Sequence, residues 1–190
     1  MAIGRYVVAA ALAATCSAAS ASAGGSATVR VIGSSDARMC YEAAELPGAP
    51  RPADLRRCDD AIQVGGLTRE ELAATHVNRG ILKIRRGQIE AAIADFDAAL
   101  TIDPNQPEAY LNKGFALMRR EQPGEALGLF TVAIERSTIR PEVTHYGRAT
   151  AHEALGDARA AYYDYRRASE LAPRWREPLI DLARFRVTRR

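Results

Sequence analysis

The chain has 190 residues, of which 47% are apolar, and it carries 26 Lys and Arg residues against 23 Asp and Glu residues. This length and apolar content suit one domain with a real core, and the balanced charge excludes a disordered tail. A net charge of +3 argues against a nucleic-acid partner, for which a dense basic face is expected. Aromatic residues make up only 6% of the chain, so packing must depend on small side chains in close contact, which favours helices.

Residues 1–23 have the pattern of a secretory signal peptide. Arg5 is a positive n-region, residues 6–14 are an apolar run too short to span a membrane, and residues 21–23 form a small-x-small cleavage site. Cys16 leaves a second interpretation open, because a Cys after an apolar run resembles a lipoprotein signal. We therefore expect an exported protein, periplasmic or secreted, with anchoring through a lipidated Cys16 as the alternative.

Residues 24–35 are small and polar and are expected to form a flexible lead-in. Residues 36–66 contain two short amphipathic runs on either side of a Pro-rich stretch, which predicts a helical hairpin. Cys40 and Cys58 lie one in each run, and an even pair in an exported chain is most simply a disulfide that staples the hairpin. Two buried free thiols are the alternative, and a metal site is disfavoured because no His or second Cys pair lies nearby in sequence.

From Thr68 onward the sequence predicts helix after helix with short connections. Thr68 and Glu71 form a capping box, which marks the start of a helix. Pro107 and Pro141 are suited to the first turn of later helices, where a missing N–H costs nothing. No segment alternates like a strand, so the predicted fold class is all-α.

A period of 34 residues runs through this helical region. The first two copies match at Gly80 and Gly114, Ala92 and Ala126, Phe96 and Phe130, and Ala99 and Ala133. A third copy lies 35 residues further on, with Ala149, Ala161, Tyr165 and Ala168. We interpret the small residues as points of close approach between the two helices of a unit, and the aromatic residues as filling the gap between neighbouring units.

These positions resemble the tetratricopeptide repeat, whose signature is W-x2-L-G-x2-Y, then A-x3-F, then P. The first copy reads His76-x2-Arg79-Gly80-x2-Lys83, followed by Ala92-x3-Phe96. The resemblance implies a helical-hairpin solenoid with repeats at 67–106, 107–141 and 142–175 and a capping helix over 176–190. The sequence departs from the pattern at Thr138, where Pro is expected, and at Ala149, where Gly is expected.

The resemblance also implies a groove for a partner protein, because the first helices of such repeats line a concave surface that holds peptides or helices. Position by position, the implied lining residues are Val77, Asn78, Ile81, Ile84, Leu111, Asn112, Phe115, Met118, Tyr146 and Thr150. Asn78 and Asn112 are suited to bond an extended peptide backbone. An exposed stripe would be the partner site, and the alternative is that the N-terminal hairpin or the last helix covers it.

Repeats that clamp the acidic C-terminal tails of chaperones carry polar groove residues where this chain has Val77 and Ile81, so that function is not implied.

The sequence offers no catalytic constellation. His76, His145 and His152 occupy large positions of the repeat and are explained by packing, although His145 and His152 leave a metal or catalytic site as a remote alternative. Asp95 and Asp97 lie on different sides of a helix and are expected to be solvated or paired with Arg. We therefore expect no enzyme activity, no cofactor, no metal, no nucleic acid and no small-molecule substrate.

Residues 174–190 contain six Arg against Glu177 and Asp181. Such a basic end is suited to touch anionic lipid headgroups or a polyanion, although it also fits a solvated face around an apolar stripe. The sequence thus predicts a non-enzymatic adaptor of the cell envelope with a protein or peptide partner. The alternative is a membrane- or polyanion-associated accessory protein that acts through its Arg-rich C-terminal helix.

Overall fold

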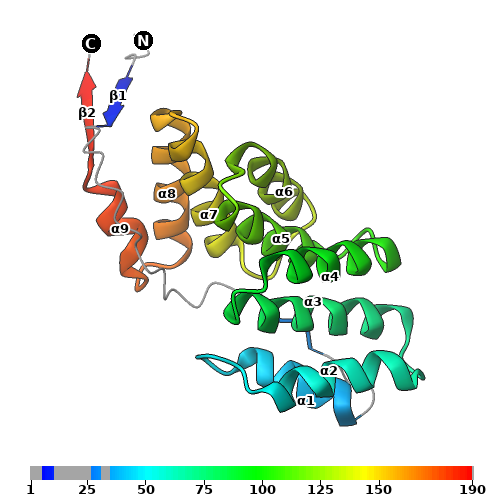
Figure 1. The fold of residues 1–190 in the computed structure, drawn as a ribbon. Helices are drawn as coiled ribbons and strands as arrows, with labels where there is room; N and C mark the ends of the chain where they lie inside the picture. Colours follow the sequence, from blue (N-terminus) through cyan, green and yellow to red (C-terminus); the bar gives the residue numbers. More distant parts are fainter. Residues whose placement is uncertain (1–5, 11–26, 31–34, 190) are drawn as a thin grey trace. The chain divides into compact units, whose positions relative to one another are not determined.

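The computed structural model describes residues 6–10, 27–30 and 35–189, which form nine α-helices and a two-stranded ribbon (Figure 1). The chain divides into two compact units, Gly25–Ile139 and a second unit made of Met1–Gly24 with Arg140–Arg190. Successive helices pair as hairpins in both units. The predicted fold of tetratricopeptide-type helical hairpins is therefore confirmed, with the ribbon as an addition that the sequence did not predict.

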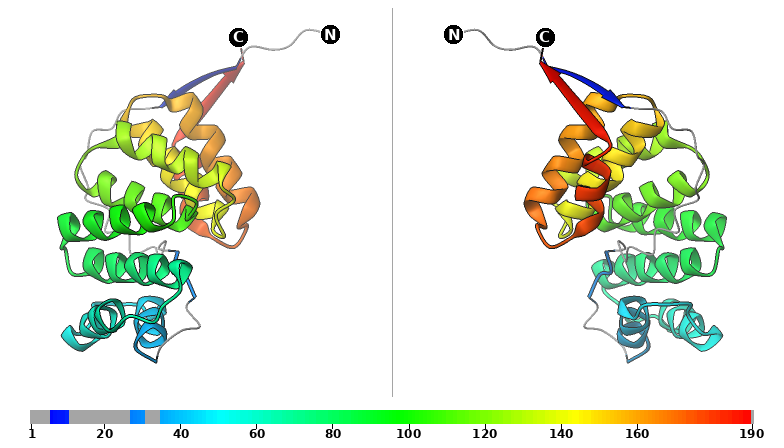
Figure 2. Two further views of the ribbon diagram at one scale, coloured as in Figure 1. Left: turned by 90° about the vertical axis from the view of Figure 1, so that its right-hand side faces the viewer. Right: turned by 90° about the vertical axis from the view of Figure 1, so that its left-hand side faces the viewer.

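The unit Gly25–Ile139 consists of three helical hairpins. Their helices are α1 (Ser35–Glu45) with α2 (Pro52–Val64), α3 (Arg69–Arg85) with α4 (Ile89–Ile102), and α5 (Pro107–Arg119) with α6 (Pro123–Glu135). The hairpins lie one on the next, since α1 and α2 both pack on α3 and α4 packs on α5 (Figure 2). Their common core is built from small buried residues such as Ala73, Ala92 and Ala99 around the fully buried Phe96.

The second unit contains one further hairpin, α7 (Pro141–Ala154) with α8 (Ala158–Leu171), and the short helix α9 (Arg176–Leu182), which packs on α8. Strand β2 (Phe185–Arg189) pairs antiparallel with β1 (Tyr6–Ala10). The prediction of a capping helix over 176–190 is therefore wrong beyond Leu182, and so is the expectation that no strand occurs. The run Phe185-Arg186-Val187-Thr188 is rich in aromatic and β-branched residues, which fit a pleated ribbon better than a helix.

Residues 6–10 lie within the predicted signal peptide, and Cys16 lies outside the described residues.

Local signals read from the sequence set the helix boundaries. The Thr68 hydroxyl accepts the Glu71 N–H at 3.2 Å while the Glu71 carboxylate accepts the Thr68 N–H at 3.0 Å, so the predicted capping box starts α3. Pro107 and Pro141 stand at the first turns of α5 and α7. The cap and the two prolines thus fix where α3, α5 and α7 begin.

The first helix of each repeat ends in the same turn. The second residue after the last helical residue has positive φ in all three cases, 74° at Gly87, 58° at Glu121 and 83° at Gly156. The next N–H then reaches back to a carbonyl five residues earlier, as Gln88 does to Lys83 at 2.9 Å and Asp157 does to His152 at 2.9 Å. This closure satisfies carbonyls that the helix end leaves free.

The aromatic residue of each repeat lies against the small residue of its own hairpin. Gly80 contacts the ring of Phe96, and Gly114 contacts the ring of Phe130. The interpretation that these rings fill the gap between neighbouring units is therefore incomplete, because Phe96 and Phe130 also pack on the small residue of their own hairpin. The small residue is needed because a ring, and not only another helix backbone, occupies the space beside it.

Thr138 stands where the repeat pattern expects Pro, and its hydrogen bonds explain this difference. Its hydroxyl donates to Oε1 of Glu108 at 3.2 Å, and the following Ile139 N–H donates to the same oxygen at 2.9 Å. Glu108 and Thr138 are both buried, so these bonds compensate the burial of the carboxylate. A proline at 138 would have no hydroxyl to offer.

Candidate functional site

A segment outside the helices and strands, Ala27–Arg30, lies on the face of α3 that the repeat pattern assigns to the groove. The side-chain amide of Asn78 donates to the Val29 carbonyl at 2.7 Å, and the Val29 N–H donates to the Asn78 side-chain oxygen at 2.9 Å. Both ends of one carboxamide are thus used on one residue of the segment. The segment and α3 are 49 residues apart in sequence.

Asn112 on α5 binds the same segment two residues earlier. Its amide nitrogen donates to the Ala27 carbonyl at 3.0 Å and to the Glu108 carbonyl of its own helix at 2.7 Å. The carbonyl groups of Ala27 and Val29 thus each accept a hydrogen bond from one of two Asn side chains that lie one repeat apart. Asn78 and Asn112 are almost fully buried, at 0% and 1% exposure.

Apolar side chains surround this pair of amides. Val29 packs against the core cluster that contains Cys40, Val77 and Ile81, and also against a smaller cluster of Ala37, Ala61 and Ala74. Ala27 and Thr28 are buried as well, with 1% and 8% of their surface exposed. The expectation of a flexible lead-in over 24–35 is therefore wrong for residues 27–30, and residues 24–26 and 31–34 lie outside the described residues.

Half of the groove residues implied by the resemblance are buried in this arrangement. Those residues are Val77, Asn78, Ile81, Leu111 and Asn112. Ile84, Phe115 and Met118 are partly exposed. The stripe on α3 and α5 is thus not an open apolar surface, and among the described residues the segment 27–30 provides the contacts to both Asn side chains.

Phe115 contributes to packing inside the second repeat. Its ring meets that of Phe130 edge to face, with 5.1 Å between centroids. This is the geometry that aromatic pairs prefer in protein cores. A substitution at Phe115 would therefore disturb the hairpin as well as any groove.

Tyr146 and Thr150 belong to the second unit, where neighbouring elements engage them. The Tyr146 hydroxyl donates to Asp181 of α9 at 2.8 Å, and its ring packs at a tilt of 51° against that of Trp175, with 4.8 Å between centroids. The Thr150 hydroxyl donates to the Gly147 carbonyl at 2.7 Å. The last helix thus covers the Tyr146 position, which is one of the two arrangements that the sequence left open.

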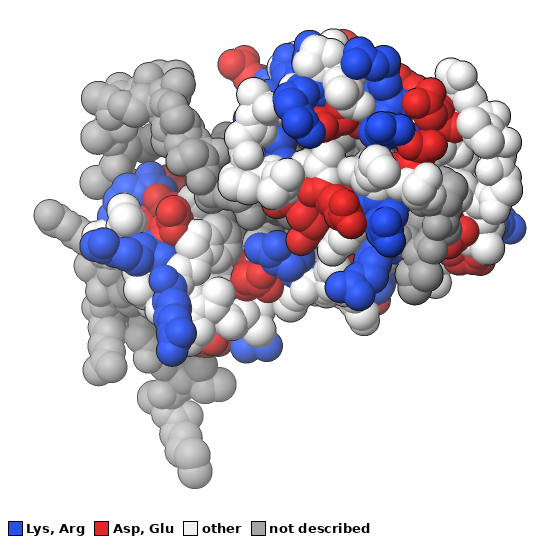
Figure 3. All heavy atoms as spheres, turned by 90° about the horizontal axis from the view of Figure 1, so that it is seen from below, with Lys and Arg blue, Asp and Glu red and all other residues white. Residues whose placement is uncertain are grey.

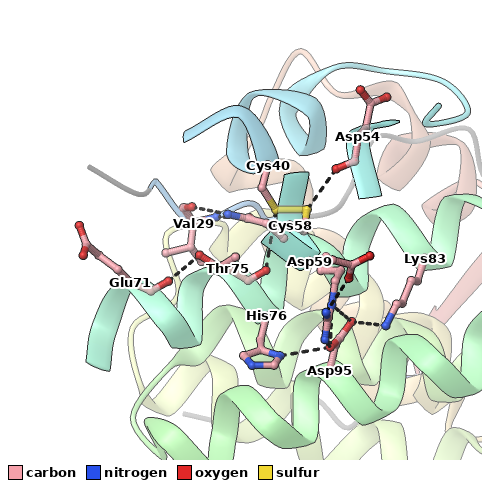
Figure 4. Close-up of a disulfide and its surroundings, with 12 residues drawn as sticks. Val29, Cys40, Asp54, Cys58, Asp59, Glu71, Thr75, His76, Lys83 and Asp95 are labelled. Atoms are coloured by element: carbon pink, nitrogen blue, oxygen red, sulfur yellow. Dashed lines mark hydrogen bonds and ion pairs between the residues drawn. A yellow bond between two sulfur atoms is a disulfide. The ribbon is translucent and has the colours of Figure 1, made fainter. Parts of the chain in front are cut away.

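Two buried carboxylates, Asp95 and Asp164, each lie at the centre of a polar cluster, and the first is Asp95 on α4. It accepts from Arg79 at 2.6 Å, from Lys83 at 2.8 Å and from His76 at 3.1 Å, all three on α3 (Figure 4). Arg79 also binds Asp59 of α2 at 2.7 Å. Burial alone would raise the pKa of Asp95, but the hydrogen bonds from His76, Arg79 and Lys83 outweigh it and hold the pKa below its ordinary range.

The second cluster repeats the first 69 residues later. Asp164 on α8 accepts from His145 at 2.8 Å and from Arg148 at 2.7 Å, and His152 lies 3.9 Å away. Burial acts to raise the pKa of Asp164, and the bonds from His145 and Arg148 lower it overall. His145 and His152 therefore face a carboxylate that already has cationic partners.

The sequence interpretation explained the histidines by packing and missed these pairings. Aligning the repeats with one another would have indicated these pairings. The first and third copies share His, Arg and Asp at matching positions, whereas the middle copy has Tyr110, Lys113 and Leu129 there. The pairing of Asp95 with Arg was expected and is observed. Among the described residues no group of three or more His, Cys, Asp and Glu side chains is arranged to hold a metal ion.

The predicted disulfide between Cys40 and Cys58 is present, and it joins α1 to α2 (Figure 4). Both residues are fully buried, and Cys40 Sγ lies 3.9 Å from the Thr75 carbonyl of α3. The bond therefore fixes the hairpin whose core also receives Val29.

The charged surface of α1 and α2 is mixed in sign. Seen from below, basic and acidic side chains alternate, and neither sign forms a continuous patch (Figure 3). Arg57 pairs with Asp36 at 2.8 Å and Arg51 pairs with Asp54 at 2.9 Å. This face does not have the character of a polyanion-binding surface.

No helix within the described parts of the chain combines the length and apolar character needed to cross a bilayer.

Comparisons with known proteins agree with this architecture. A family model described as TPR repeat matches residues 76–120. Human serine/threonine-protein phosphatase 5 is 33% identical over 134 residues, which are 70% of this chain and 24% of that protein, and the mouse protein gives the same values. The chain thus spans about a quarter of the length of the curated relatives it matches.

Solved structures show the same fold. The first TPR of Spaghetti (RPAP3), bound to the HSP90 peptide SRMEEVD, has a TM-score of 0.56 at 23% identity and covers 58% of this chain and 87% of its own. The Arabidopsis OM64 TPR domain has a TM-score of 0.57 at 19% identity and covers 60% of this chain and 93% of its own. YrrB, described as a TPR protein with an unusual peptide-binding site, has a TM-score of 0.54 at 24% identity, covering 58% and 56%.

The helical hairpins, the 34-residue period, the family model over residues 76–120 and the structural neighbours together support the TPR repeat family for this chain.

Proposed function

We propose that the protein is a non-enzymatic adaptor of the cell envelope, which binds an extended peptide of a partner protein on the α3 and α5 face. The observation that carries this proposal is the pair Asn78 and Asn112, which bond the backbone of one segment at residues 29 and 27. A site that bonds the backbone of one peptide is chemically able to bond that of another. Peptide binding is also what the printed descriptions of RPAP3 and YrrB record for those proteins.

The polar clusters support a structural rather than a catalytic role for the remaining titratable groups. Asp95 and Asp164 are engaged by Arg, Lys and His partners. A general base needs an available lone pair and a pKa near the working pH, whereas both carboxylates have lowered pKa values. We therefore assign binding, and not catalysis, to this chain.

Export is supported by two features of different kinds. Residues 1–23 carry the signal-peptide pattern, and the Cys40–Cys58 disulfide is of the kind that persists in oxidising compartments. Both features support the proposal of a periplasmic or secreted location, with lipidation of Cys16 as the variant that would add a membrane anchor.

The alternative function through the Arg-rich end finds little support among the described side chains. Arg184 is held by Glu153 at 2.7 Å and by Asp181 at 3.0 Å. An arginine that is already paired contributes less to binding lipid headgroups or a polyanion. We therefore do not favour a membrane role over the groove.

The proposed function is tested by selecting random heptapeptides from a display library on the full chain. Bound peptides should lose at least about 10-fold in affinity when Asn78 and Asn112 are both changed to Ala, since two backbone contacts disappear. Gln63→Ala, an exposed amide on α2, is the control and should bind like the original protein. Equal binding by the double variant, with an unchanged circular dichroism spectrum, would place any peptide site elsewhere.

A further inference from the structure

In the structure, the segment Ala27–Arg30 of this chain lies at the proposed site. Three hydrogen bonds join residues 27 and 29 to the two Asn side chains, and Val29 enters the core beside Val77. Every one of these hydrogen bonds uses a backbone group of the segment. A partner peptide with the same backbone conformation can therefore replace all three.

The side chains of the segment show which partner sequences fit. Ala27 and Thr28 are nearly enclosed, at 1% and 8% exposure, so a long or charged side chain has no room at either position. Val29 packs on apolar side chains of α1 and α3. The site thus suits an uncharged stretch with a small residue and, two positions later, a β-branched aliphatic residue.

Release of the segment has to overcome its hydrogen bonds and the burial of Ala27 and Val29. Its hydrogen bonds to Asn78 and Asn112 exchange for bonds to water on release, so each contributes little to the net affinity. Arg30 is exposed and contributes no buried contact. A covalently tethered segment competes with a free peptide because tethering raises its local concentration to the millimolar range.

We propose that Ala27–Arg30 is an internal ligand that keeps the α3 and α5 face occupied until a partner peptide of the pattern small-x-β-branched displaces it. This inference rests on the proposed function, since it requires the same face to bind a partner. The inference adds two points to the proposed function: the partner peptide has a small residue followed two positions later by a β-branched residue, and the segment must be displaced before the partner binds. The apparent affinity for a partner is lowered by the fraction of molecules in which the face is occupied.

The test uses Val29→Asp in the full chain, which places a charge against the apolar cluster and releases the segment without changing α3 or α5. The probe is fluorescein-labelled Gly-Ser-Ala-Thr-Val-Arg-Val amide, which copies residues 25–31. Fluorescence anisotropy should show at least about 10-fold tighter binding to Val29→Asp than to the original chain, because the tethered competitor is gone. Arg30→Asp, at the neighbouring exposed residue, should stay within about 2-fold of the original.

Two further measurements separate the possible failures. Adding Asn112→Ala to Val29→Asp should abolish the gain, and Ala27→Asp should reproduce the gain if Val29→Asp folds poorly. Equal affinity of the original chain and both segment variants for library peptides that depend on Asn112 would overturn the internal ligand but leave the proposed function standing. Peptide binding that is independent of Asn78 and Asn112 in every variant would overturn both.

Discussion

Gly80 lies directly beneath the ring of Phe96, and a Cβ atom built on Gly80 would be 2.5 Å from Cε1 of that ring. The same relationship recurs one repeat later, where a Cβ on Gly114 would be 2.7 Å from Cε1 of Phe130. Phe96 and Phe130 are both fully buried, so neither ring can move aside without disturbing its neighbours. The same contact between a glycine and a phenylalanine ring thus recurs after 34 residues.

Replacing Gly80 with Ala should destabilise the protein by about 1–3 kcal/mol, which is the usual cost of overpacking a core. Gly128 in the interior of α6 is the matched control, because a Cβ there meets nothing within 4 Å. Gly128→Ala should be neutral or stabilising by up to about 1 kcal/mol through helix propensity. Urea unfolding of both variants measures the contrast, and a loss of stability at Gly128 as large as that at Gly80 would contradict it.

The periodic part of the fold could be predicted from the sequence because each repeat carries its own evidence. Gly80, Gly114 and the rings that follow them mark equivalent contacts, and the Thr68 cap marks where α3 starts. The two cysteines predicted the disulfide because α1 and α2 bring one partner each. These features depend on short-range patterns that repeat or pair within a few dozen residues.

The docking of residues 27–30 could not be predicted in the same way. The segment is small and polar, and nothing in its own pattern indicates a partner 49 residues away. Asn78 was recognised as able to bond an extended backbone, but the identity of that backbone depends on tertiary structure. The pairing of β1 with β2 could not be predicted for the same reason, because the two strands lie near opposite ends of the sequence and each forms only with the other.

Asp95→Asn should cost about 3–5 kcal/mol at neutral pH, because it removes a buried carboxylate and leaves the partly buried Lys83 without it and Arg79 with Asp59 alone. The pKa of Asp95 is lower in the folded state than in the unfolded chain. Its stabilisation is therefore complete above about pH 4 and is lost as the pH falls below that value. Unfolding by urea between pH 7 and pH 2 should thus show a shallower acid-induced loss for Asp95→Asn than for the original chain.

The control for this experiment is Asp97→Asn, two residues along the same helix. Asp97 is 52% exposed and pairs with Lys113 at the surface. Such pairs contribute about 0–1 kcal/mol, so the control should unfold nearly like the original chain at both ends of the pH range. Similar losses for the two variants would mean that burial of Asp95 has no energetic consequence.

Reduction of the disulfide should destabilise the chain by about 3 kcal/mol, since Cys40 and Cys58 close a loop of 18 residues. The measurement is the thermal midpoint with and without dithiothreitol in a Cys16→Ser background, where only this pair can respond. A variant with Ala at both positions should have the low midpoint under either condition. An unchanged midpoint on verified reduction would show that α1 and α2 are held by packing alone.

Tyr165→Phe should lower stability at pH 7 by about 1–2 kcal/mol, because the Tyr165 hydroxyl donates to Glu153 at 2.8 Å and a phenyl ring fills the same space. Phe96 and Phe130 occupy the equivalent positions of the other repeats, so the ring itself fits. Tyr163→Phe is the control, since Tyr163 is 40% exposed, and it should change stability by no more than about 0.5 kcal/mol.

The same variant should alter the alkaline limit of stability. Burial, followed by the negative charge of Glu153, raises the pKa of Tyr165 in the folded protein above its ordinary value. Its contribution is therefore complete below about pH 10 and declines as the pH rises further, when the unfolded chain ionises first. Urea unfolding at pH 7 and pH 11 should show the gap between the original chain and Tyr165→Phe narrowing at the higher pH. A gap that widens would mean that the folded protein accommodates the phenolate, contrary to its position beside Glu153.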